Sequence, residues 1–200
     1  MLKQGLFTIT LWLSVLAAQA NGANVPTSSE YTVDPTHSFV QARTQHLGIS
    51  WLYLRFDVTG GVLVYDPKTP KNNKIQLDVD VASLDSNNFE RDAHLRKKYL
   101  LTATHPHASF SSTGYQGDAE KGILTGVLTL NGVEKTVRLP VEKVGIGADP
   151  WGGYRVGFEG KFTIDTRDYG YKYQLGDHSF KVELTLSIEG VRNTEPTRKQ

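Results

Sequence analysis

The sequence predicts an all-β chain that closes into a barrel, with one short helical insertion. Polar and apolar residues alternate along several segments, and only one segment has helical spacing. The 200 residues include 19 Gly and 8 Pro, a content that favours many turns. Hydrophobic residues make up 38% of the chain, which is enough for a packed domain and too much for a disordered one.

Charge and cysteine content exclude several classes of function. The chain carries 22 basic and 21 acidic residues, a formal net charge of +1, which argues against a nucleic-acid partner held by a basic surface. It has no Cys, so disulfide frameworks, thiolate nucleophiles and Cys-based zinc sites are excluded.

The first twenty residues have the pattern of a signal peptide. Lys3 is followed by an uncharged, mostly apolar run, Leu6–Ala18, and then by the small-x-small sequence Ala18-Gln19-Ala20. The run is shorter than the roughly 20 residues that span a bilayer. We therefore expect cleavage before Asn21 and a periplasmic location. Residues 21–30 are small and polar and predict a flexible lead-in.

Strands account for most of the remaining chain. Alternation is clearest in residues 75–81, 156–164 and 180–188, where one face of each strand is apolar and the other polar. Weaker patterns predict further strands in residues 38–46, 51–65, 108–115, 122–130 and 133–144.

Glycines mark the breaks between and within these strands. Gly60-Gly61 predicts a bulge or bend, and Asn131-Gly132 predicts a hairpin turn because both residues tolerate positive φ. The Gly- and Pro-rich stretch 145–153 predicts a loop.

One segment predicts a helix of about three turns, residues 88–100. Phe89, Ala93 and either Leu95 or Lys97 fall near one helical face, and Asp85 or Ser86 is expected as the N-cap. Eight or nine strands around this helix must hide their edges, and closure into a barrel does so. An eight-stranded barrel has room either for its own side chains or for one small ligand.

Seven strings in order resemble the YceI family, small exported bacterial proteins similar to lipocalins, and most closely its periplasmic enterobacterial type. They are YTVDPTHS from Tyr31, HLGISWLY from His46, ERDAHLR from Glu90, PHASFSST from Pro106, LTGVLTLNG from Leu124, DPWGGYRVGF from Asp149 and LxIEGVR from Leu186.

The resemblance implies an extended eight-stranded antiparallel barrel over residues 31–192, followed by a polar tail, 193–200. It also implies a long apolar tunnel that holds a polyisoprenoid, such as a quinone tail, as a ligand and not as a cofactor. Homodimers are suggested as well.

Candidate ligand-binding residues follow from the expected inner face and mouth of the barrel. Alternation in residues 38–46 places Val40, Ala42, Thr44 and His46 on one face, and the small Ala42 and Thr44 predict a roomy tunnel there. The full candidate set is Val40, Ala42, Thr44, His46, Leu47, Trp51, Phe56, Arg91, His94, Leu95, Phe110, Phe158 and Phe162.

The helical segment leaves two functional interpretations open. Arg91, Asp92 and His94 could bind a head group or lock the helix over one end of the barrel. With His46 they could also form the mouth of an enzyme that acts on such a lipid. Lys97-Lys98 is interpreted as a solvated face, with transient membrane-surface contact as the alternative.

No catalytic or metal site is predicted. The pair His105 and His107 has no third ligand in the nearby sequence, and no Ser, His and acid are spaced as in a hydrolase. A third possibility is a structural protein related to stress, whose barrel is filled by its own side chains.

Overall fold

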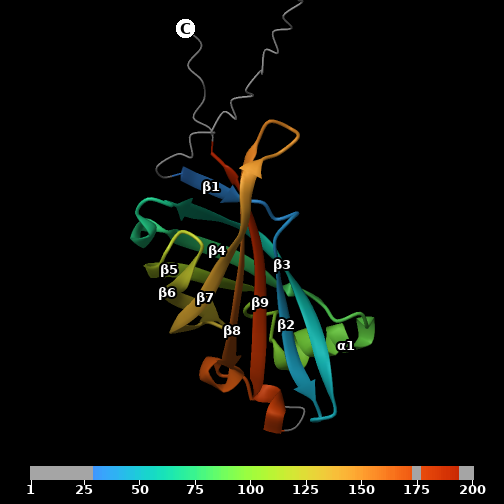
Figure 1. Cartoon of the computed structure of the whole chain (residues 1–200). Helices are drawn as coiled ribbons and strands as arrows, with labels where there is room; N and C mark the ends of the chain where they lie inside the picture. The colour runs from blue at the N-terminus through green and yellow to red at the C-terminus, as the bar shows by residue number, and fades with distance from the viewer. Residues whose placement is uncertain (1–28, 173–176, 194–200) are drawn as a thin grey trace, which may run out of the picture.

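The protein is a closed antiparallel β-barrel with one short helix, seen here in a computed structural model that describes residues 29–172 and 177–193 (Figure 1). The strands are β1 Ser29–Val33, β2 Phe39–His46, β3 Ser50–Tyr65, β4 Lys74–Asp85, β5 His107–Gly117, β6 Lys121–Leu130, β7 Val133–Ala148, β8 Tyr154–Asp165 and β9 Lys181–Arg192. The helical segments are α1 Phe89–His94, a π-helical turn η2 Leu95–Tyr99, and the 3₁₀ turns η1 Pro70–Asn72, η3 Thr166–Tyr169 and η4 Asp177–Phe180. The expected signal peptide and the tail from residue 194 lie outside the described residues.

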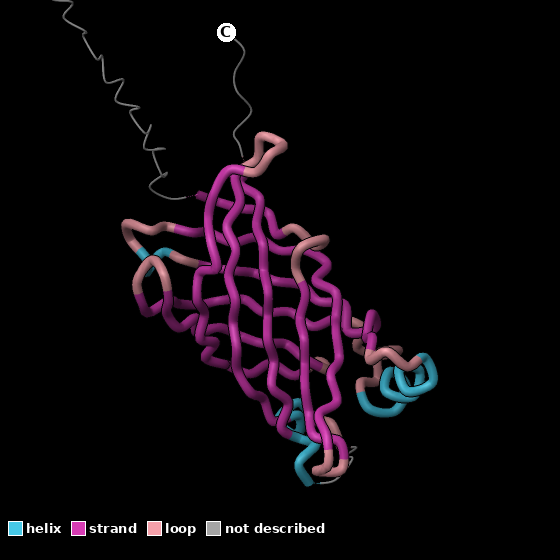
Figure 2. Tube along the Cα trace, turned by 45° about the vertical axis from the view of Figure 1, so that its right-hand side comes forward, coloured by secondary structure: helices cyan, strands magenta, loops and turns pink. Residues whose placement is uncertain are grey.

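Strand pairing closes the ring, so the predicted fold class is confirmed. Strands β2 to β9 pair in the order β3-β2-β9-β8-β7-β6-β5-β4, and β4 returns to β3. Figure 2 shows this wall as one continuous surface, with the helical segments outside it at the lower end and on the left and right flanks. Because the ring is closed, each of these strands pairs with a neighbour on both sides.

Strand β1 shares a position in the barrel wall with β2. Both β1 and β2 pair antiparallel with β3 and with β9, β1 at residues 62–65 of β3 and β2 at residues 50–57. They are therefore two halves of one stave, interrupted at residues 34–38. The chain enters this stave at Ser29, two residues inside the expected lead-in.

Most local turn predictions agree with the structure. Asn131 and Gly132 have φ of 53° and 73° and join β6 to β7 as a two-residue hairpin. The β3–β4 register shifts between Val58 and Gly60, which places the predicted bulge at the glycine pair. The predicted loop 145–153 was too long, because Gly145–Ala148 continue to pair with β8 after a register shift between Lys143 and Gly145.

The helix begins later and faces differently than predicted. Its N-cap is Asn88, whose side chain accepts a hydrogen bond from the Arg91 N–H, and not Asp85 or Ser86. Phe89 is 81% exposed, whereas Asp92 and Leu95 are buried. The buried face is set by Asp92, which accepts hydrogen bonds from Ser86, the residue that follows β4.

Candidate functional site

The barrel interior contains a central cavity with an apolar wall and a volume of about 150 Å³. Five candidate residues from the sequence line it, on β2, β3, β5 and β8: Val40, Ala42, Phe56, Phe110 and Phe162. Alternation places them there, because every second side chain of a barrel strand points inward. Apolar cavities of this size stay dry and accept a molecule of about the size of benzene.

Two smaller cavities adjoin the central one. The tyrosine-end cavity, about 60 Å³, shares four wall residues with it, namely Leu77, Phe110, Leu139 and Leu186. The hairpin-end cavity, about 90 Å³, shares five others, namely Leu54, Leu100, Thr166, Tyr171 and Val182. The three spaces therefore form a series inside the barrel, divided by mostly apolar side chains.

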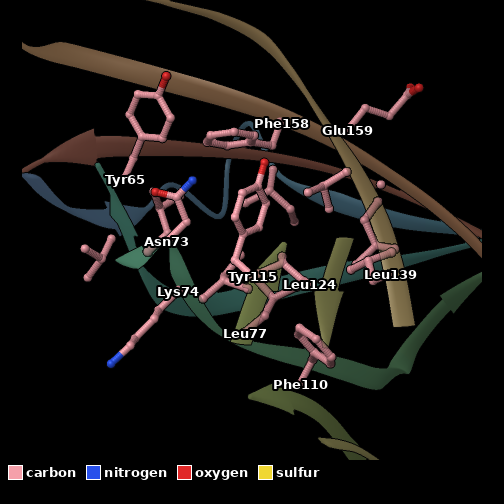
Figure 3. Close-up of a pocket in the computed structure, with 17 residues that line it drawn as sticks. Tyr65, Asn73, Lys74, Leu77, Phe110, Tyr115, Leu124, Leu139, Phe158 and Glu159 are labelled. Carbon is pink, nitrogen blue, oxygen red and sulfur yellow. The ribbon is translucent and has the colours of Figure 1, made fainter. Parts of the chain in front are cut away.

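Aromatic rings surround the tyrosine-end cavity (Figure 3). The candidate Phe158 lies there, edge to face with Tyr65 at 5.5 Å between ring centroids. The Tyr65 hydroxyl donates to the Ala119 carbonyl at 3.0 Å, and the Tyr115 hydroxyl donates to the Asp118 carbonyl at 2.7 Å. Both hydroxyls thus tie this end of the barrel to the β5–β6 loop.

Tyr65 and Tyr115 were not among the sequence candidates. Burial raises the pKa of Tyr115, so its ring lies in an environment that disfavours charge. Each tyrosine lies at an inward position near the end of an alternating strand. Alternation along these strands was therefore the sequence signal that could have identified both tyrosines as cavity residues.

Side chains with hydroxyl groups lie around the hairpin-end cavity. Of the candidates, Thr44 and Leu95 line it. The Thr44 hydroxyl lies 3.0 Å from the Ser179 carbonyl and 3.2 Å from the Lys181 carbonyl, its two possible acceptors. Tyr171 separates this cavity from the central one, and burial raises the pKa of its hydroxyl to about 12.

Five candidates lie outside these cavity walls in the described part of the chain. His46, Leu47 and Trp51 are exposed at the end of the β2–β3 hairpin, beyond Thr44, the last buried residue of β2. Alternation placed His46 inward, but it is the last residue of β2, beyond the part of that strand that pairs with β9, and its side chain is exposed.

Arg91 and His94 also lie away from the cavity walls, on the exposed side of α1. The Arg91 guanidinium donates to the Ser86 hydroxyl at 2.7 Å, and the Asp92 carboxylate accepts from the Ser86 N–H at 3.0 Å. His94 lies with its ring centroid 5.6 Å from that of Tyr99. Arg91 and Asp92 therefore meet at Ser86, where they fasten the helix to β4.

A charged cluster spans the interruption between β1 and β2. The ligand atoms of Asp34, His37 and Glu189 lie within 4.8 Å of one another, which is compatible with a metal ion. However, the Arg155 guanidinium donates to Asp34 at 2.8 Å and also to Glu189. A cation is therefore already supplied by the chain, and the cluster acts as an ion-pair clamp on the broken stave.

No helix in the described ranges is long and apolar enough to cross a membrane.

Comparison with known proteins points to one family. The model of the YceI-like domain matches residues 31–190. A UPF0312 protein of Photorhabdus laumondii is 44% identical over 196 residues, which cover 96% of this chain and 99% of the relative. Protein YceI of Escherichia coli O157:H7 is 43% identical over 168 residues, 82% of this chain and 88% of the relative.

Solved structures match the same barrel. The YceI protein of Campylobacter jejuni is 27% identical with a TM-score of 0.65, covering 76% of this chain and 90% of that one. A polyisoprenoid binding domain from Saccharophagus degradans, implicated in plant cell wall breakdown, is 18% identical with a TM-score of 0.58, covering 82% and 98%. At that identity the second likeness concerns the fold alone.

Proposed function

The chain belongs to the YceI family, and from this premise we propose that it carries an isoprenoid lipid whose hydrocarbon tail occupies the barrel interior. The single observation that carries the proposal is the apolar wall of the central cavity, continued at both ends by smaller spaces. Each CH₂ group moved from water into such a space gains about 0.8 kcal/mol. A carrier needs no chemistry beyond this burial.

The hydrocarbon tail of such a lipid can occupy the barrel interior only if the side chains that divide the three cavities move. Small-molecule sites usually measure about 300–1,000 Å³, more than the central cavity alone. The side chains that separate it from the hairpin-end cavity include Leu100 and Tyr171, which come from segments outside the barrel strands. We expect these to move aside, because such connecting segments open more readily than paired strands.

The periplasm is the proposed location. The supporting observation is the signal-peptide pattern of the first twenty residues, together with a lipid ligand that cannot cross an aqueous compartment unaided. The Saccharophagus degradans domain, which is described as polyisoprenoid binding, supports the ligand class through its shared fold.

Native mass spectrometry tests the proposal directly. The protein is exported, purified without detergent, measured intact, and then extracted with organic solvent. We expect a stoichiometric adduct that extracts as a prenyl chain. A bare mass, combined with no displacement of a fluorescent lipid by prenyl quinones, would favour the filled-barrel alternative and reject the carrier function.

Filling the central cavity provides the matched variant. Ala42 is 2% exposed and lines the cavity, so Ala42→Phe places a ring in the space proposed for the tail. Gln41 is the neighbouring residue on the outer face of β2, so Gln41→Phe adds the same ring outside the barrel.

We expect Ala42→Phe to weaken prenyl-quinone binding at least about tenfold, since excluding two or more CH₂ groups has that effect. Gln41→Phe is expected to bind as the wild type does. Equal binding by both variants would place the ligand elsewhere.

A further inference from the structure

The β2–β3 hairpin ends in an exposed apolar tip. Leu47 is 56% exposed and Ile49 82%, although both are aliphatic. Trp51 and Tyr53, on the outer face of β3 directly behind the tip, are 43% and 47% exposed. Large apolar groups that gather on one surface of a soluble protein mark an interaction site.

The turn itself is unusual in its choice of residues. Leu47 and Gly48 have φ of 56° and 72°, close to the 53° and 73° of Asn131 and Gly132 in the β6–β7 hairpin. Asn fits a left-handed position readily, whereas Leu is strained there. The two loops differ in length, three residues against two, but share these φ values. The β2–β3 hairpin therefore carries an aliphatic side chain, at a cost in backbone strain, where the β6–β7 turn carries Asn.

The tip lies at the end of the barrel that contains the hairpin-end cavity. The inner face of the same hairpin contributes Thr44, Leu52 and Leu54 to that cavity, while Trp51 and Tyr53 point outward. In Figure 1 the tip is at the lower end of the molecule, next to the 3₁₀ turn η4, and the β7–β8 loop with Trp151 is at the upper end.

Three exposed lysines lie on segments that line the hairpin-end cavity. Lys97 and Lys98 are on η2, and Lys172 follows Tyr171. Both η2 and Tyr171 contribute to the wall of the hairpin-end cavity. These three lysines are exposed and form no ion pair with the side chains that the structure describes. Two acidic groups near this end, Asp165 and Glu183, are each already paired with Arg or Lys, whereas Asp168 on η3 is exposed.

We propose that this end of the barrel docks on a bilayer that contains anionic phospholipid. Leu47 and Ile49 enter the acyl region, Trp51 and Tyr53 lie at the headgroup level that aromatic residues prefer, and the lysines face the lipid phosphates. A single hairpin tip is much smaller than the roughly 20–30 residues a side of a stable protein interface, which favours a membrane over a second copy.

The proposal gives the carrier a place to exchange its lipid, and in that respect it rests on the proposed function. Docking and cavity occupancy are nevertheless measured separately. Ala42→Phe is expected to lose the bound lipid and keep vesicle binding, and Leu47→Asn is expected to do the reverse.

Vesicle flotation tests the docking surface. Wild-type protein is mixed with vesicles of phosphatidylcholine alone or with added phosphatidylglycerol. We expect binding to the anionic vesicles, weakened by salt because screening acts on exposed charges. Leu47→Asn gives the hairpin the turn chemistry of Asn131-Gly132, so the variant is expected to fold at least as well while its vesicle affinity falls about tenfold.

Trp151→Ala is the matched control, because Trp151 is 80% exposed at the opposite end of the barrel. It is expected to float as the wild type does. The proposal is overturned if the wild type ignores anionic vesicles, if Leu47→Asn floats equally well, or if Leu47→Asn instead converts a dimer to a monomer in the absence of vesicles. The last result would assign the tip to a second copy of the chain.

Discussion

At the scale of single residues, one glycine makes room for a ring that borders two cavities. A Cβ atom on Gly126 would lie 2.5 Å from both the Phe110 ring and the Ser111 carbonyl oxygen. Phe110 lines the central and the tyrosine-end cavities. Because Gly126 on β6 has no side chain, the Phe110 ring can occupy this position.

Gly126→Ala is expected to destabilise the fold by about 1–3 kcal/mol, the usual effect of overpacking, because the Ser111 backbone cannot turn aside. Urea unfolding measures this change. Gly114→Ala, on β5, is the control, since a Cβ there meets nothing within 4 Å. Its free energy of unfolding should lie within about 0.5 kcal/mol of wild type. Similar losses in both variants would show that glycine content, and not this contact, decides stability.

Residue predictions from alternation succeeded inside the wall and failed at its end. Val40, Ala42 and Phe56 lie at inward positions of continuous strands, so a period of two was sufficient to place them. His46 has the same phase, but it lies at the last residue of β2, where the side chain meets solvent. The sequence pattern contains no information on where the wall stops.

At the scale of elements, the short α1–η2 segment depends on one buried carboxylate. Asp92 is 7% exposed and accepts from both the backbone N–H and the hydroxyl of Ser86. The same segment brings Leu95 into the hairpin-end cavity. Anchoring at Ser86 thus positions part of that cavity's wall.

Asp92→Ala is expected to lower stability by about 1–3 kcal/mol, since it leaves the two Ser86 donors without this acceptor. Hydrogen exchange should show faster exchange of amides 89–100, with the barrel strands unchanged. The exposed Glu90 on the same helix serves as the control, and Glu90→Ala should exchange as wild type does. Uniformly faster exchange across the barrel in Asp92→Ala would contradict this local role.

Element types were more predictable than the contacts that join them. Helical spacing identified residues 88–100, but its buried face follows from Ser86, a partner that periodicity does not reveal. The split stave escaped prediction for the same reason. Asp34 follows the last residue of β1 and is held by Arg155, a residue 121 positions away in the sequence.

At the scale of the whole molecule, ion pairs hold both ends of β8, and the pair between Arg155 and Asp34 joins segments that are distant in sequence. Hydrogen bonds from Thr36, Arg155 and His37 hold the pKa of Asp34 well below its usual range. Arg167 and Lys181 lower the pKa of Asp165 in the same way, at the other end of β8. Both carboxylates thus favour the folded state only while they are ionised.

The sign of the pH dependence follows from these lowered pKa values. An unfolded Asp has a pKa of about 3.9, so the stabilisation is fully present above that pH and is lost as the pH falls through the lower folded value. The free energy of unfolding should therefore be steady near neutrality and decline from about pH 4 downward. This range is more acidic than a histidine switch would give, although His37 contacts Asp34.

Asp34→Asn tests this argument because it keeps the shape of the side chain and removes the ionisable group. The variant should be less stable than the wild type at pH 7, and the difference should shrink toward pH 2, where the wild-type carboxylate is increasingly protonated. Urea unfolding at several pH values measures both quantities. Asp78→Asn is the control, since Asp78 is exposed on β4 and the described residues give it no ion pair. If Asp34→Asn and wild type lost stability in parallel on acidification, the clamp at the split stave would not be the source of the acid sensitivity, and the remaining carboxylates of the barrel would have to supply it.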